Sequence, residues 1–207
     1  DLVRSRGLGD VYKRQQTGLV NSVDKYPSAT LWDLGSYLMG MISARELGVI
    51  DGATFDARLT KLIGSLESLP LIDGVAPNKA YDTRTLHSVD YENHEVPNGI
   101  GWSALDIARI GVPITIIVWR YPEHTARLRA LLAHWHFDQI MNGGRLIGAE
   151  RNKKGELDRQ QEGRFGYEQY AAKSLFLLGQ DVHEALRYDA NVAVAKVSGQ
   201  SIAYDSR

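Results

Sequence analysis

Three predicted helix starts each carry an aromatic residue close to an acid, and this recurrence most limits what the chain can fold into. The intervals between the three starts are similar, and each is long enough for two helices and a connecting loop. The pattern predicts repeated helical hairpins that present rings and carboxylates on one shared rim. The aromatic residues and acids concerned are Trp32 with Asp33, Trp102 with Asp106, and Tyr167 with Glu168.

Apolar residues recur every three or four positions in five segments, which predicts five helices and a mainly α fold. Inside the third of these segments, Gly111 and Pro113 predict a kink or a break. Small β-hairpins are expected as insertions, because Arg145–Ala149 and Glu156–Gln160 flank a turn and residues 191–202 alternate apolar with polar. Three of the predicted helices begin near Thr30, Thr54 and Trp102, and the other two cover about residues 123–137 and 167–178.

Residues 1–15 show no hydrophobic period and no apolar core of a signal peptide. They resemble a translated sequencing adapter, so we expect them to be non-native and to lie outside the fold. A natural N-terminal arm is the alternative. The domain is therefore expected over residues 16–207, with its natural start missing.

Composition excludes several classes of function. A formal net charge of −1, with 43% hydrophobic and 24% charged residues, gives no electrostatic bias toward nucleic acid, so no nucleic-acid partner is expected. The absence of cysteine removes disulfide scaffolds, thiolate zinc sites and cysteine nucleophiles. Ten tyrosines and four tryptophans would suit a ring-lined cleft, although buried aromatic residues usually belong to a core.

Glu162 and Asp33 are the best candidates for a catalytic pair of carboxylates. Glycoside cleavage needs one acid to protonate the leaving oxygen and a second carboxylate that attacks or activates water. Glu162 lies where a loop meets a helix, and its alternative role is a surface salt bridge to Arg164. Asp33 and Asp106 each follow a hydroxyl residue by three positions, so both acids have helix capping as their alternative role.

Further polar residues are candidate substrate contacts. Glu168 lies between Tyr167 and Tyr170 and could bind sugar hydroxyls, or it is an ordinary acid of a first helical turn. In the long loop 71–98, the pattern favours Asp82 and Arg84 as an ion pair that fixes the loop over a catalytic pair. The loop also holds His87, Asp90 and His94, but without a supporting motif, and no metal or other cofactor is expected.

Five runs, in order, resemble the bacterial domain-of-unknown-function 3131 family over about 17–207. That family is similar to glucoamylase-like α/α-toroid enzymes that act on polysaccharides. Because the family's domain is longer than this chain, the resemblance implies a partial (α/α)6 toroid that is truncated at its C-terminus, with about half of the ring present. The five runs are Thr17–Val23, Thr30–Leu38, Pro77–Arg84, Gly101–Asp106 and Glu162–Lys173.

The resemblance implies a carbohydrate-active domain, similar to a glycoside hydrolase, that acts on a bacterial envelope or extracellular glucan. A non-catalytic polysaccharide-binding domain and a helical-repeat scaffold for protein partners are the alternatives. A periplasmic or envelope location and fused membrane or transferase domains are expectations from the family. Platforms for sugar rings are expected at Trp32, Trp102, Tyr167 and Tyr81.

Overall fold

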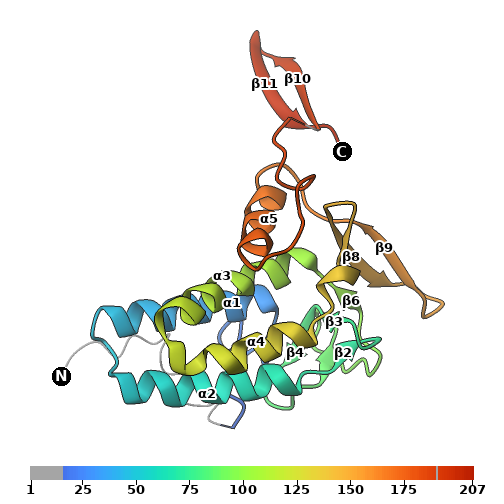
Figure 1. Ribbon diagram of the computed structural model, residues 1–207. Helices are drawn as coiled ribbons and strands as arrows, with labels where there is room; N and C mark the ends of the chain where they lie inside the picture. The colour runs from blue at the N-terminus through green and yellow to red at the C-terminus, as the bar shows by residue number, and fades with distance from the viewer. Residues whose placement is uncertain (1–15, 190) are drawn as a thin grey trace.

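The computed structural model describes residues 16–189 and 191–207 (Figure 1). The adapter interpretation of residues 1–15 therefore lies outside the described residues. The order of elements starts with a two-residue strand (Ser28–Ala29) and a helical hairpin, and then passes through short strands in the long loop. Two more helices, three strands and a fifth helix follow before a final β-hairpin.

The first hairpin consists of α1 (Leu31–Glu46) and α2 (Gly52–Ser68). Thr30 caps α1, since its hydroxyl accepts the Asp33 N–H while the Asp33 carboxylate accepts the Thr30 N–H in return. Gly48 follows the end of α1 at φ 71°, a backbone conformation that costs glycine little. The sequence prediction of this hairpin is confirmed.

Helix α3 (Ala104–Arg120) is the central helix, because it packs against both α1 and α5 (Tyr167–Leu177). Gly35 permits the approach of α1, since a Cβ there would lie 3.1 Å from backbone atoms of Arg109 and Ile110. Helix α4 (Thr125–His134) lies beside α2, between 3-10 turns Pro122–His124 and Phe137–Gln139. In the described residues, no helix is both long and apolar enough to traverse a lipid bilayer.

Of the predicted kink or break, the break is wrong, because helix α3 runs without interruption through Pro113. Burial explains the outcome: Ile110, Ile114 and Ile117 are fully buried, and this packing outweighs the hydrogen bond that proline cannot donate. The Thr115 hydroxyl also donates to the Gly111 carbonyl within the same turn.

Strands form four small antiparallel sheets among the described residues. The sheet most relevant to the site joins β6 (Gly101–Trp102), β8 (Arg145–Arg151), β7 (Met141–Asn142) and β9 (Leu157–Gln161). The hairpin of β10 (Val192–Val197) and β11 (Gln200–Asp205) projects away from the helices (Figure 1). The remaining strands are β1 (Ser28–Ala29), β2 (Leu71–Ile72), β3 (Ala76–Pro77), β4 (Ala80–Asp82) and β5 (Ser88–Val89).

The fold is mixed α/β, and the prediction of a mainly α, partial toroid is wrong. Helices make up 40% of the structure and strands 22%. Most of the unexpected strands are two or three residues long and lie in the loop between α2 and α3. Such short strands show no measurable period of two, so hydrophobic patterning misses them.

Candidate functional site

A pocket of about 430 Å³ lies where the N-terminal ends of α1, α3 and α5 come together. Two carboxylates, one lysine and three aromatic rings face it. The lining residues are Trp32, Lys79, Tyr91, Ser103, Leu105, Asp106, Glu162 and Tyr167. The predicted meeting of the three helix starts therefore takes the form of one acidic, ring-lined pocket.

Glu162 is held at the N-terminus of α3 by two donors. Its Oε1 accepts from the Ser103 hydroxyl at 2.7 Å, and its Oε2 accepts from the Ala104 N–H at 2.6 Å. A helix N-terminus favours a negative charge, so this arrangement suits an ionised carboxylate. The alternative salt bridge to Arg164 is not formed, because Arg164 donates to the Gly163 carbonyl instead.

Gly148 makes room for the Glu162 side chain. A Cβ at Gly148 would lie 2.6 Å from Glu162 Oε2, which is closer than such contacts occur. The Glu162 N–H also donates to the Leu146 carbonyl at 2.9 Å, which fixes the backbone next to β8. Strand β8 therefore sets both the position of Glu162 and the space that it occupies.

Asp106 lies in the first turn of α3 and has an unusual proton affinity. Burial, together with the negative charges of Glu162 and Asp33, raises the pKa of Asp106 to about 7, against the opposing effects of Ser103 and Lys79. The Asp106 N–H donates to the Ser103 hydroxyl at 3.1 Å. Two neighbouring carboxylates thus differ in environment: Glu162 accepts hydrogen bonds at the start of α3, and the pKa of Asp106 lies near neutral pH.

Asp33 has a mainly structural place. Its carboxylate accepts both the N–H and the hydroxyl of Thr30 at 2.9 Å, so the capping alternative describes its contacts. It does not line the pocket, although its charge acts on Asp106. Asp106 differs because no reciprocal bond from its carboxylate to the Ser103 backbone closes a capping box.

The rings of Trp32 and Tyr167 meet beside the pocket, with centroids 6.0 Å apart and planes inclined by 31°. The Tyr167 side chain is 59% exposed, and Tyr91 from the long loop is 63% exposed. The Arg109 guanidinium lies over the Trp32 ring at 5.1 Å. Tyr167 and Tyr91 therefore offer the most accessible ring surface at the pocket.

Trp102 and Tyr81 do not provide the expected platforms, because both are fully buried in the core. The Trp102 indole N–H donates to the Ile147 carbonyl at 3.0 Å, and the Tyr81 hydroxyl donates to the Pro70 carbonyl at 2.7 Å. A ring without exposed surface cannot stack on a sugar. Both residues instead brace the strands that surround the pocket.

The other predicted contacts lie away from the pocket lining. Hydrogen bonds from Arg84 and Asn93 outweigh burial and lower the pKa of Asp82 to about 2, so the expected loop-fixing pair is present. Glu168 is buried and pairs with Arg207 and Gln161. Sequence reasoning passed over Lys79, Ser103 and Leu105 as lining residues, since nothing local indicates that they converge with Glu162.

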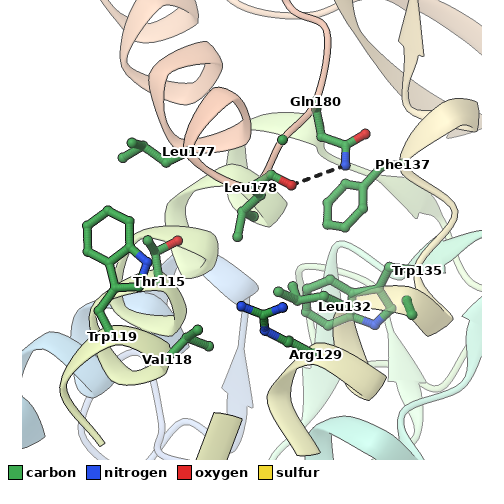
Figure 2. Close-up of a pocket in the computed structure, with 12 residues that line it drawn as sticks. Thr115, Val118, Trp119, Arg129, Leu132, Trp135, Phe137, Leu177, Leu178 and Gln180 are labelled. Carbon is green, nitrogen blue, oxygen red and sulfur yellow. Dashed lines mark hydrogen bonds between the residues drawn. The ribbon is translucent and has the colours of Figure 1, made fainter. Parts of the chain in front are cut away.

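A larger cavity of about 590 Å³ lies between α3, α4 and the end of α5, and its lining is drawn in Figure 2. Arg129 is the charged group there, beside apolar residues such as Trp119, Leu132 and Phe137. No carboxylate lines it, so it lacks the pair of acids that hydrolysis of a glycosidic bond requires. Size alone therefore does not identify the site.

One group of potential metal ligands occurs among the described residues, away from the pocket. Oxygen or nitrogen atoms of Asp56, Glu123 and His124 lie within 4.8 Å of one another. His124 Nε2 is 3.1 Å from Asp56 Oδ1, which a hydrogen bond between α2 and the 3-10 turn explains. In the long loop, His94 pairs with Asp90 and His87 pairs with Glu95, so these side chains do not converge.

Comparison with solved structures shows a shared fold. Two proteins described as a "putative glucoamylase" match this chain. The one from Bacteroides fragilis has 14% sequence identity and a TM-score of 0.60, and the one from Bacteroides caccae has 13% sequence identity and a TM-score of 0.65. An endo-β-1,2-glucanase from Chitinophaga pinensis, solved with sophorotriose and glucose, matches with 13% identity and a TM-score of 0.65. These likenesses concern the fold alone.

The matches cover 96%, 95% and 97% of this chain but 52%, 53% and 53% of the respective solved chains. The chain thus spans about half the length of each. Comparison with curated proteins gives no match. The model of one family matches residues 10–207, and on this evidence the chain belongs to the family described as "protein of unknown function (DUF3131)".

Proposed function

We propose that this protein hydrolyses glycosidic bonds in a glucan or related polysaccharide, with Asp106 and Glu162 as the reacting pair. The observation that carries the proposal is the contrast between these two acids in one pocket. The pKa of Asp106 is raised to about 7, whereas Glu162 accepts hydrogen bonds from the start of α3. Acid and base roles are separated in this way in glycosidases.

In the proposed reaction, the protonated Asp106 donates its proton to the glycosidic oxygen as the bond to the anomeric carbon breaks. Glu162 acts on the anomeric carbon, either directly as a nucleophile or by accepting a proton from the attacking water. The stereochemistry of the product distinguishes these two routes. In the nucleophilic route, both carboxyl groups return to their starting states when water cleaves the covalent intermediate. In the other route, Asp106 ends ionised and Glu162 protonated, and proton exchange with the solvent restores both.

The surroundings of the pair support a carbohydrate substrate. Tyr167 and Tyr91 are exposed rings at the pocket, and Lys79 adds a hydrogen-bond donor. Aromatic faces and a few polar groups are a suitable lining for a sugar. The complex of the structurally similar endo-β-1,2-glucanase with sophorotriose and glucose supports an oligosaccharide as the ligand class to test first.

The test is release of reducing ends from a panel of β- and α-linked glucans by protein expressed from its complete reading frame. We expect turnover of at least one glucan, and a loss of about a hundredfold or more in Glu162→Gln and Asp106→Asn. Glu156→Gln removes an exposed carboxylate in the turn before β9 and is the matched control.

Binding by calorimetry in parallel separates the alternatives. Glucan affinity in the wild type without turnover would contradict the proposal and favour a non-catalytic binding domain. A folded protein that binds no glycan at all would leave the scaffold alternative. Turnover that survives both substitutions would remove Asp106 and Glu162 from the mechanism.

A further inference from the structure

Arg109 lies one helical turn after Asp106 on α3 and adjoins the pocket through the ring of Trp32. We propose that Arg109 binds an acidic group of the substrate, either the carboxylate of a uronic acid or a phosphate ester. This inference rests on the proposed function, since it names the class of glycan that the same site would accept.

The guanidinium of Arg109 is held in a defined position by two rings and two hydroxyls. It lies over Trp32 at 5.1 Å and over Tyr170 at 5.7 Å from the ring centroids. Its Nη1 donates to the Tyr170 hydroxyl oxygen at 2.6 Å, and its Nη2 donates to the Ser36 hydroxyl at 3.4 Å. Helices α1, α3 and α5 each contribute one side of this cluster.

The cluster offers more donors than it uses. Within the described ranges, the Arg109 guanidinium donates to two hydroxyl oxygens, and its Nε–H is buried without an acceptor. Tyr170 accepts from Arg109, and its own hydroxyl proton has no acceptor in the part of the chain that the structure describes. A guanidinium edge beside a free hydroxyl proton is complementary to an oxyanion, which accepts several hydrogen bonds at once.

The position of Arg109 relative to the acids makes it useful for specificity. Asp106 and Arg109 are three residues apart on α3, which corresponds to about 4.5 Å of rise, so Arg109 follows Asp106 by one helical turn. Asp33, Asp106 and Glu162 would otherwise repel a negatively charged sugar. A fixed cation beside Trp32, next to the pocket, would therefore act together with Lys79 in favouring an acidic substituent at one position of the glycan.

The experiment compares three matched probes: a β-glucan oligosaccharide, the same oligosaccharide oxidised to the carboxylate at C6, and the same oligosaccharide phosphorylated at O6. Affinity is measured by calorimetry with the wild type and Arg109→Gln. We expect the wild type to bind one acidic probe about tenfold more tightly than the neutral probe, and Arg109→Gln to lose that preference while binding the neutral probe as before. The probe that is preferred identifies carboxylate or phosphate.

Arg129→Gln is the matched control, because Arg129 is an exposed arginine in the other cavity and should leave the preference unchanged. Tyr170→Phe removes the free hydroxyl without removing charge, and we expect it to reduce the preference several-fold even if Arg109→Gln folds poorly. Equal binding of all three probes by the wild type, or a preference that survives both substitutions, would overturn the inference. Preferential binding of an acidic probe without cleavage of any glycan would retain this inference and reject the proposed hydrolysis.

Discussion

Replacing Asp106 with asparagine should stabilise the folded protein at alkaline pH. The burial of Asp106 and its proximity to Glu162 and Asp33 raise the pKa of its carboxyl group to about 7 from 3.8. The unfolded chain therefore releases this proton more easily than the folded chain does. Folding is penalised as pH rises above about 4, and the penalty is complete above about 7. Asparagine keeps the shape of the side chain and removes the charge.

The size of the effect follows from the two pKa values. Ionising Asp106 in the folded state at pH 8 costs up to about 4 kcal/mol relative to the unfolded chain. Since the surroundings relax around a new charge, we expect Asp106→Asn to raise the free energy of unfolding at pH 8 by roughly 2 kcal/mol. At pH 4 the acid is protonated in the folded state, so the two proteins should differ little.

Urea unfolding at several pH values between 4 and 8 measures this difference. Asp138→Asn removes an exposed carboxylate and is the control that should show no such trend. A difference between Asp106→Asn and the wild type that stays constant over this pH range would refute the reasoning. So would a wild type that becomes steadily more stable than the variant as pH rises.

Three further substitutions test separate parts of the structure. Thr30→Ala removes the α1 cap and should lower the free energy of unfolding by about 1 kcal/mol in urea; no change would mean that the cap is not needed. Gly101→Ala should prevent stable folding or cost on the order of 3 kcal/mol, because its φ is 118° and a Cβ would lie 2.0 Å from the Ala149 carbonyl oxygen; circular dichroism and melting check this. Tyr167→Ala should weaken glycan binding in calorimetry, whereas removal of the exposed Trp119 ring should not; equal losses would place the ligand elsewhere.

Sequence patterns correctly predicted the features that depend on contacts between residues close together in the chain. The Thr30 and Asp33 spacing predicts the first helix and its cap, and the structure contains both. The pairing of Asp82 with Arg84 is equally local, since a single residue separates them in sequence. The convergence of Trp32 and Tyr167 was also expected from the repeated helix starts, and the structure places these rings 6.0 Å apart.

Sequence patterns did not predict the properties that depend on residues far apart in the chain. Trp102 looks like a rim residue in sequence, but its position in β6 next to β8 turns the indole into the core. Asp106 has the spacing of a capping acid, and its burial together with the nearby charges of Glu162 and Asp33 distinguishes its role. The short strands of the long loop likewise depend on pairing across the chain, which periodicity cannot reveal.

The most direct test of the central claim is a titration of the Asp106 carboxyl carbon by NMR, assigned with Asp106→Asn, in the wild type and in Glu162→Gln. We expect a midpoint near pH 7 in the wild type, because of burial and the neighbouring charges. In Glu162→Gln we expect a lower midpoint, since a negative charge beside Asp106 has been removed. A midpoint near 4 in both proteins would contradict the claim that these two acids form one coupled pair in the pocket.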